Sequence, residues 1–257
     1  MRTRYTIAIG DIHGMRDVMN SLLSELTSRF SAAQARFIFL GDLIDRGRAG
    51  SNTMTALVEF FDHRPTSALI LGNHDEYLLK CFQGTLDVIE GRKWLWNGGD
   101  ATLASYGFYD QFNLRELTST LNRLEPRHRL LLERAVAMVL TERHCFVHAG
   151  IDPHVPIEEQ DGRTTRWIRD GFLDYPDPFE KIVVHGHSIT QTGLPEVSSN
   201  RIAVDTGSYQ TGRISAAIFD EDELAGFISA EKIGTEISLR SFDARVHEVK
   251  LEFSGSR

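Results

Sequence analysis

The stretch YTIAIGDIHG, residues 5–14, decides the fold. Its apolar, β-rich first half predicts a buried strand, which ends at a glycine followed by polar residues. Two later stretches repeat this order, RFIFL at residues 36–40 and SALIL at residues 67–71. Helical patterns follow the three stretches, at about 15–29, 50–63 and 75–82. Strands that alternate with helices in this way indicate an α/β fold, in which functional groups collect beyond the carboxyl ends of the strands.

The pattern changes over residues 83–141, where strand signals fade. Helices are expected near 113–123 and 126–140, the second opening with Pro126 at a favoured first-turn position. Strand patterns then return, so we interpret 83–141 as a helical insertion within a single domain that spans residues 1–257. The returning strands are expected at 145–150, 181–187, 201–207 and 213–220, with two more near 226–231 and 246–252 that complete a second sheet.

Composition limits the class of protein. The chain has 257 residues and a formal net charge of −8, with 41% hydrophobic and 25% charged residues. This acidic balance argues against a nucleic-acid binder, whose affinity depends on Lys and Arg. No apolar run is long enough to span a membrane, and the first residues leave no room for a signal-peptide core. Cys81 and Cys145 are too few for a disulfide framework, so we expect a cytoplasmic protein. The sequence leaves the oligomeric state open.

Five expected strand ends carry polar residues of the same kinds. They are GDIHG (10–14), GDLIDRG (41–47), GNHD (72–75), HAG (148–150) and HGH (185–187). A single Asp or Asn after a strand is usually a turn residue or a helix cap. Five such ends in one chain have no shared structural purpose, and carboxylates with imidazoles are typical ligands of Mn, Fe or Zn. So many buried charges would also require compensating cations.

The order and spacing of these motifs, over residues 10–188, resemble the calcineurin-like metallophosphoesterases, specifically the bacterial serine/threonine phosphatases of the phosphoprotein phosphatase branch. The resemblance implies a metallophosphatase-type β-sandwich of two mixed sheets flanked by helices (αββα). It also implies two divalent metal ions per chain, with Mn²⁺ expected first and Fe, Zn or Ni as alternatives. The six implied metal ligands come from the five motifs: Asp11 and His13 for the first metal, Asp42 as the bridge, and Asn73, His148 and His187 for the second.

The resemblance implies a mechanism as well. A hydroxide that bridges the two metals would attack phosphorus in line with the leaving oxygen. Arg46 would clamp the phosphate oxygens through its planar fork, and Asn73 would contact them. His74 would protonate the leaving group and would itself be oriented by Asp45. Arg169, in TTRWIRDGFL, is expected as a second phosphate ligand, with a position on an exposed helix as the alternative.

Three further features have open interpretations. His185 lies two residues before His187 on the same strand face, and we expect it to support the site rather than to bind a metal. Asp205, in AVDTG, is interpreted as a turn residue, with an approach to the metals as the alternative. Trp94 and Trp96 do not share a helix face, so one of them is expected to be partly exposed.

Three functions compete. The first is hydrolysis of phosphoserine or phosphothreonine, with phosphotyrosine as a further substrate, because WLWNGG, TLASYG and WIR resemble bacterial phosphatases of this kind. The second is symmetrical hydrolysis of bis(5'-nucleosyl) tetraphosphates, which GNHD in place of GNHE favours. Asp75 is expected to orient the helix after this loop, so the change should not disable catalysis. The third, an inactive binding module, would need a broken ligand set. We therefore predict the first, acting on a phosphorylated protein or a small phosphoester.

Overall fold

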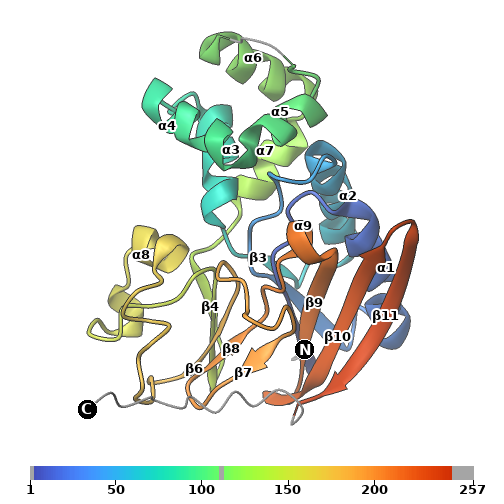
Figure 1. Ribbon diagram of the computed structural model, residues 1–257, viewed down its shortest axis with the longest axis vertical. Helices are drawn as coiled ribbons and strands as arrows, with labels where there is room; N and C mark the ends of the chain where they lie inside the picture. The colour runs from blue at the N-terminus through green and yellow to red at the C-terminus, as the bar shows by residue number, and fades with distance from the viewer. Residues whose placement is uncertain (1–2, 110–112, 245–257) are drawn as a thin grey trace.

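The computed structural model describes residues 3–109 and 113–244, and two mixed β-sheets form its centre (Figure 1). The first has the strand order β11-β10-β9-β1-β2-β3 and the second the order β4-β5-β6-β8-β7. The strands of the first sheet are β1 Tyr5–Ile9, β2 Ala35–Phe39, β3 Ala68–Leu69, β9 Arg213–Asp220, β10 Glu223–Ile233 and β11 Glu236–Asp243. Those of the second are β4 Met138–Leu140, β5 His144–Val147, β6 Ile182–His185, β7 Glu196–Val197 and β8 Arg201–Ala203.

Successive side chains of a strand point to opposite faces of its sheet, so each sheet can pack against a layer on either side. Ala8 of β1 and Phe146 of β5 belong to one apolar cluster that also contains residues of β2, β6, β8 and β9, so the two sheets share this inner core. Ile7 and Ile9 point to the other face of the first sheet. There they join a second cluster with the helices α1 Arg16–Arg29, α2 Gly50–His63 and α3 Asn73–Gln83.

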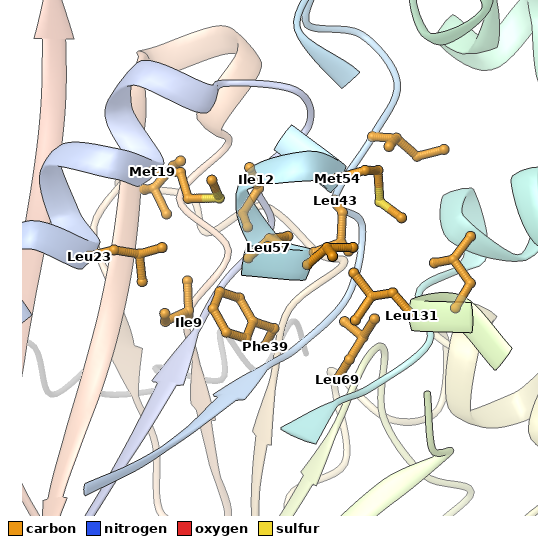
Figure 2. Close-up of a cluster of buried hydrophobic side chains, with 14 of the residues drawn as sticks. Ile9, Ile12, Met19, Leu23, Phe39, Leu43, Met54, Leu57, Leu69 and Leu131 are labelled. Atoms are coloured by element: carbon orange, nitrogen blue, oxygen red, sulfur yellow. The ribbon is translucent and has the colours of Figure 1, made fainter. Parts of the chain in front are cut away.

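Figure 2 shows the helix-covered face of the first sheet in detail. Ile9, Phe39 and Leu69 come from the neighbouring strands β1, β2 and β3, and they lie beneath apolar side chains of α1 and α2 such as Met19 and Leu57. The outer face of the second sheet is covered instead by the connection between β5 and β6, which includes α8 Gly162–Trp167. The expected α/β sandwich of two mixed sheets flanked by helices is confirmed.

Residues 88–133 supply helices that gather with α3 at one end of the molecule (Figure 1). They are α4 Val88–Trp94, the π-helix η1 Leu95–Gly99, α5 Asp100–Ser105, α6 Leu114–Leu124 and α7 Pro126–Glu133. The expected helix over 126–140 is too long, because the chain leaves the helix at Arg134 and forms β4 from Met138. The apolar residues of β4, Met138–Leu140, pair with β5, so sheet pairing prevails over helix propagation there.

The expectation that the strand near 226–231 helps to complete the second sheet is wrong. Strand β9 pairs antiparallel with β1, from Tyr5↔Asp220 to Ile9↔Ala216, and therefore belongs to the first sheet. A two-residue turn with positive φ at Glu221 and Asp222 joins β9 to β10 as a hairpin, so β10 and then β11 follow β9 into that sheet. The strand expected near 246–252 lies outside the described residues.

Over residues 3–109 and 113–244, no helix has the length and apolar character needed to cross a bilayer.

Candidate metal centre

The polar loops converge where several strands end, and their backbone is strained. Seven described residues other than glycine have positive φ, and five of them lie in these loops: His13, Asp42, Asp45, Arg46 and His187. A non-glycine residue in this region costs about 1–3 kcal/mol and persists only where its surroundings enforce it. Backbone strain is thus concentrated on the residues that the sequence singled out.

Asp42 lies between two groups of histidines. Its Oδ2 is 3.7 Å from Nε2 of His13 and 4.0 Å from Nε2 of His74, while its Oδ1 is 3.4 Å from Nε2 of His148. The ligand atoms of His13, Asp42 and His74 lie within 4.8 Å of one another, and so do those of Asp42, His148 and His187. One carboxylate oxygen therefore faces each group.

Two of these rings are oriented by backbone carbonyls. Nδ1 of His13 donates to the carbonyl of Ile44 at 2.9 Å, and Nδ1 of His148 donates to the carbonyl of Leu40 at 2.7 Å. Since Nδ1 carries a proton in each ring, Nε2 is the atom left to face the oxygens of Asp42. Such outer hydrogen bonds fix the tautomer of metal-binding histidines.

His13 and His187 have neutral imidazole rings whose lone pairs need a cation. Burial lowers the pKa of His13 to about 4, and burial together with His148 lowers the pKa of His187 to about 2. The Nε2 atom of His187 is buried and has no hydrogen-bond partner among the described residues. The Nε2 atom of His13 faces the carboxylates of Asp11, at 3.9 Å, and Asp42. Lone pairs that face carboxylate oxygens repel unless a cation lies between them, so these residues fit bound divalent metal.

Asp11 completes the cluster through the backbone of the HGH loop. Its two carboxylate oxygens each accept from the N–H of His187 at 3.1 Å. Burial, then the charges of Asp205 and Asp42, hold the pKa of Asp11 well above its usual value. An added Cβ at Gly186 would lie 2.1 Å from Oδ1 of Asp11, so only glycine allows this approach.

Alanine at position 186 should therefore displace the carboxylate of Asp11. We expect the Gly186→Ala variant to fold but to lose metal affinity by about 10-fold or more, the usual cost of disturbing the support of a metal ligand. Gly91→Ala is the matched control, because a Cβ at Gly91 in α4 meets only Leu86, at 3.8 Å. Metal content per chain, measured beside the melting temperature, checks the result. Equal metal content in both variants would contradict it.

His74 and Asp45 form a buried pair beside Asp42. Nδ1 of His74 donates to Oδ2 of Asp45 at 2.6 Å, and the backbone N–H of His74 donates to Oδ1 of Asp42 at 3.0 Å. Burial lowers the pKa of His74, but the carboxylates of Asp42 and Asp45 raise it by more than burial lowers it. The pKa of His74 therefore lies above its usual value. A raised pKa favours the protonated ring, which is the form that can donate a proton.

The expected phosphate ligands line a cavity of about 440 Å³ that also contains His13, Asp42, His74 and His187. The Arg46 guanidinium lies 4.8 Å from the ring centre of Tyr209 and donates to its hydroxyl at 3.2 Å. Arg169 donates to the carbonyl of His187 at 3.2 Å. Asn73 lines the same cavity, with its Oδ1 3.0 Å from Nε2 of His148. The structure thus brings all of the predicted site residues around one centre or its immediate support.

Three residues close to this centre lie outside the predicted set of ligands and catalytic residues. Tyr209, in α9 Ser208–Thr211, lines the cavity, and no motif drew attention to it. Asp205 accepts from the N–H of Gly207 at 2.8 Å in a turn, as expected, and it also lines the cavity. Burial raises the pKa of Asp205 to about 6. His185 is buried against Phe172 and does not line the cavity.

Asp75 joins two of the loops. Its oxygens accept from the backbone N–H of Leu43 at 2.9 Å and of Gly72 at 3.2 Å. Burial raises the pKa of Asp75 to about 7. The carboxylate thus caps α3 and ties it to the loop that carries Asp42, as expected from the sequence.

Comparison with known proteins identifies the family of this chain. The profile of the family described as calcineurin-like phosphoesterase matches residues 5–220. Serine/threonine-protein phosphatase 2 of Salmonella typhimurium is 26% identical over 221 residues, 82% of this chain and 91% of that protein. The asymmetrical bis(5'-nucleosyl)-tetraphosphatase PrpE of Bacillus anthracis is 25% identical over 239 residues, 84% of this chain and 90% of that protein.

Solved structures show the same fold. A cold-active protein-tyrosine phosphatase of a psychrophile Shewanella sp. superposes with a TM-score of 0.55 at 14% identity, covering 94% of this chain and 81% of that one. A metallophosphoesterase from Sphaerobacter thermophilus superposes with a TM-score of 0.52 at 19% identity, covering 94% and 89%. With the family match across most of its length, this chain belongs to the calcineurin-like phosphoesterase family and is a metal-dependent phosphoester hydrolase.

Proposed function

We propose that the chain is a phosphomonoesterase that holds two divalent metal ions, Mn²⁺ foremost, and hydrolyses phosphoserine and phosphothreonine, with phosphotyrosine as a further substrate. One observation carries the two-metal assignment: the carboxylate of Asp42 presents one oxygen to each of two histidine groups. Asp11 and His13 would hold one ion, and Asn73, His148 and His187 would hold the other.

The chain's own residues divide the remaining work. Bound divalent cations supply positive charge for the phosphate and a nucleophile at neutral pH. Arg46 and Arg169 enter the same cavity, and each offers a planar fork of donors to phosphate oxygens. His74 gives a proton to the leaving oxygen, while Asp45 holds its ring in place. The two free cysteines, Cys81 and Cys145, support a cytoplasmic location.

The relatives favour two substrate classes. The similarity to serine/threonine-protein phosphatase 2 supports a phosphoprotein substrate, and the similarity to PrpE supports a dinucleoside tetraphosphate as the second candidate. The name of that relative favours asymmetrical rather than symmetrical cleavage of such a substrate.

A substrate panel separates the candidates. We expect kcat/KM on a phosphoserine or phosphothreonine peptide to exceed that on diadenosine tetraphosphate, with Mn²⁺ added to each assay. The panel includes a phosphotyrosine peptide, and the nucleotide products are resolved by chromatography. Two molecules of ADP report symmetrical cleavage, whereas ATP and AMP report asymmetrical cleavage. A higher kcat/KM for diadenosine tetraphosphate would reverse the ranking of the two functions.

A further inference from the structure

The helical insertion reaches the catalytic pair through Asp45. Trp94, the last residue of α4, donates from Nε1 to Oδ1 and Oδ2 of Asp45, at 3.0 and 2.8 Å. Thr102 of α5 donates from its hydroxyl to Oδ1 at 2.6 Å, and the same hydroxyl accepts from the backbone N–H of Asp45 at 2.8 Å. Two helices of the insertion therefore hold the carboxylate that holds His74.

The backbone between Trp94 and Thr102 packs closely against the loop that carries Asp45 and Arg46. Gly98, at φ 101°, interrupts the helical path of η1, and its carbonyl accepts from the N–H of Arg46 at 3.1 Å. A Cβ at Gly98 would lie 2.9 Å from the nitrogen of Arg46. Positive φ and this close approach both require glycine, so the kink places the segment against residues 45 and 46.

Trp94, Thr102 and His74 together satisfy both oxygens of the Asp45 carboxylate. Asp45 is fully buried, and a buried carboxylate is costly unless its oxygens are hydrogen-bonded. Thr102 donates to Oδ1 and His74 donates to Oδ2, while Trp94 donates to both oxygens and lies nearer to Oδ2. Loss of either donor would free the carboxylate to rotate, and His74 would lose its fixed partner.

We propose that Trp94 and Thr102 are positioning residues that set the orientation of Asp45 and, through it, of His74. This inference rests on the proposed function, in which His74 donates a proton to the leaving group. It assigns a role to the insertion: its helices α4 and α5 complete the support of the proton donor.

The first test observes the hydrogen bond itself. In full-length protein loaded with diamagnetic Zn²⁺, we expect a proton resonance far downfield of the amide region, assigned to Nδ1–H of His74 because it disappears in His74→Asn. Trp94→Phe retains an aromatic ring beside Tyr77 but removes the N–H donor, and Thr102→Val removes the hydroxyl. Both variants should shift or broaden the resonance. Trp96→Phe, at a residue with 91% exposure two positions away, and Thr102→Ser, which retains the hydroxyl, should preserve it.

The second test measures turnover in a double-mutant cycle. Trp94→Phe should slow hydrolysis of a phosphoserine peptide by about 10-fold, the loss of one hydrogen bond to a charged group. The same change should slow hydrolysis of p-nitrophenyl phosphate much less. In the His74→Asn background the same change should have no further effect, because it acts through His74. Additive losses in the cycle would count against the proposal.

The outcomes distinguish the positioning role of Trp94 and Thr102 from the proton-donor role of His74. A wild-type spectrum without the downfield resonance, or folded Trp94→Phe and Thr102→Val proteins that both keep it unchanged, would overturn the positioning role. A resonance that these two variants disturb would support that role even if His74→Asn hydrolysed every substrate at the normal rate. That last result would refute only the proton-donor assignment.

Discussion

Asp42→Asn is expected to abolish turnover and to strip bound metal while preserving the fold. The neutral amide has the same shape, and its oxygen can still accept from the N–H of His74, but it lacks the anionic charge that Asp42 presents to both histidine groups. Activity should fall by on the order of 10³-fold or more, because water without a metal is a far weaker nucleophile at neutral pH. Elemental analysis and kcat on a phosphoserine peptide measure the two effects.

Chelation of the wild-type protein provides the companion experiment. Removal of divalent ions should eliminate activity, and added Mn²⁺ should restore it in the wild type but not in Asp42→Asn. The exposed Asp17 on α1 supplies a matched control, since Asp17→Asn changes the formal charge equally and should retain both metal and turnover. Full turnover by protein free of metal would refute metal-dependent catalysis.

His74→Asn should separate proton donation from metal binding. A serine leaves as a strongly basic alkoxide and needs the proton, whereas p-nitrophenolate is weakly basic and departs without it. We expect hydrolysis of a phosphoserine peptide to slow by about 10²–10⁴-fold, the usual contribution of a general acid. The loss on p-nitrophenyl phosphate should be much smaller, and metal content should not change.

Two other results would change the role of His74. Equal losses on both substrates at full metal occupancy would make it a residue that stabilises charge or positions phosphate. Loss of metal would make it a ligand, which its place among the atoms within 4.8 Å of Asp42 and His13 allows. The metal analysis is therefore performed on the same protein samples as the kinetics.

The sequence revealed the site more completely than the sheet topology. The motifs around Asp11, Asp42 and His187 are contiguous and rich in glycine, so local pattern alone exposes them. The partner of β9 depends on contacts with β1, about 200 residues earlier in the chain, which no local pattern records. The end of α7 at Glu133 was missed for a similar reason, since pairing with β5 draws the following residues into a strand.

The residues that support Asp45 and line the cavity have no distinctive sequence pattern. Trp94 and Thr102 resemble core and helix residues in sequence, and only their approach to Asp45 gives them significance. Tyr209 follows a glycine turn in a four-residue helix without a recognisable pattern. The expectation that one tryptophan of the Trp94 and Trp96 pair is exposed is confirmed, with Trp94 buried and Trp96 at the surface.

The division of the cavity between two kinds of segment has an evolutionary consequence. Asp42, Asp45 and Arg46 share one short, strained loop after β2, whereas Trp167, Arg169 and Tyr209 enter from α8, the turn after it, and α9. Sequence change in the latter connections can alter what the cavity admits while the loop that carries Asp42 and Asp45 stays the same. Related proteins can therefore share the same chemistry and differ in the substrates that they accept.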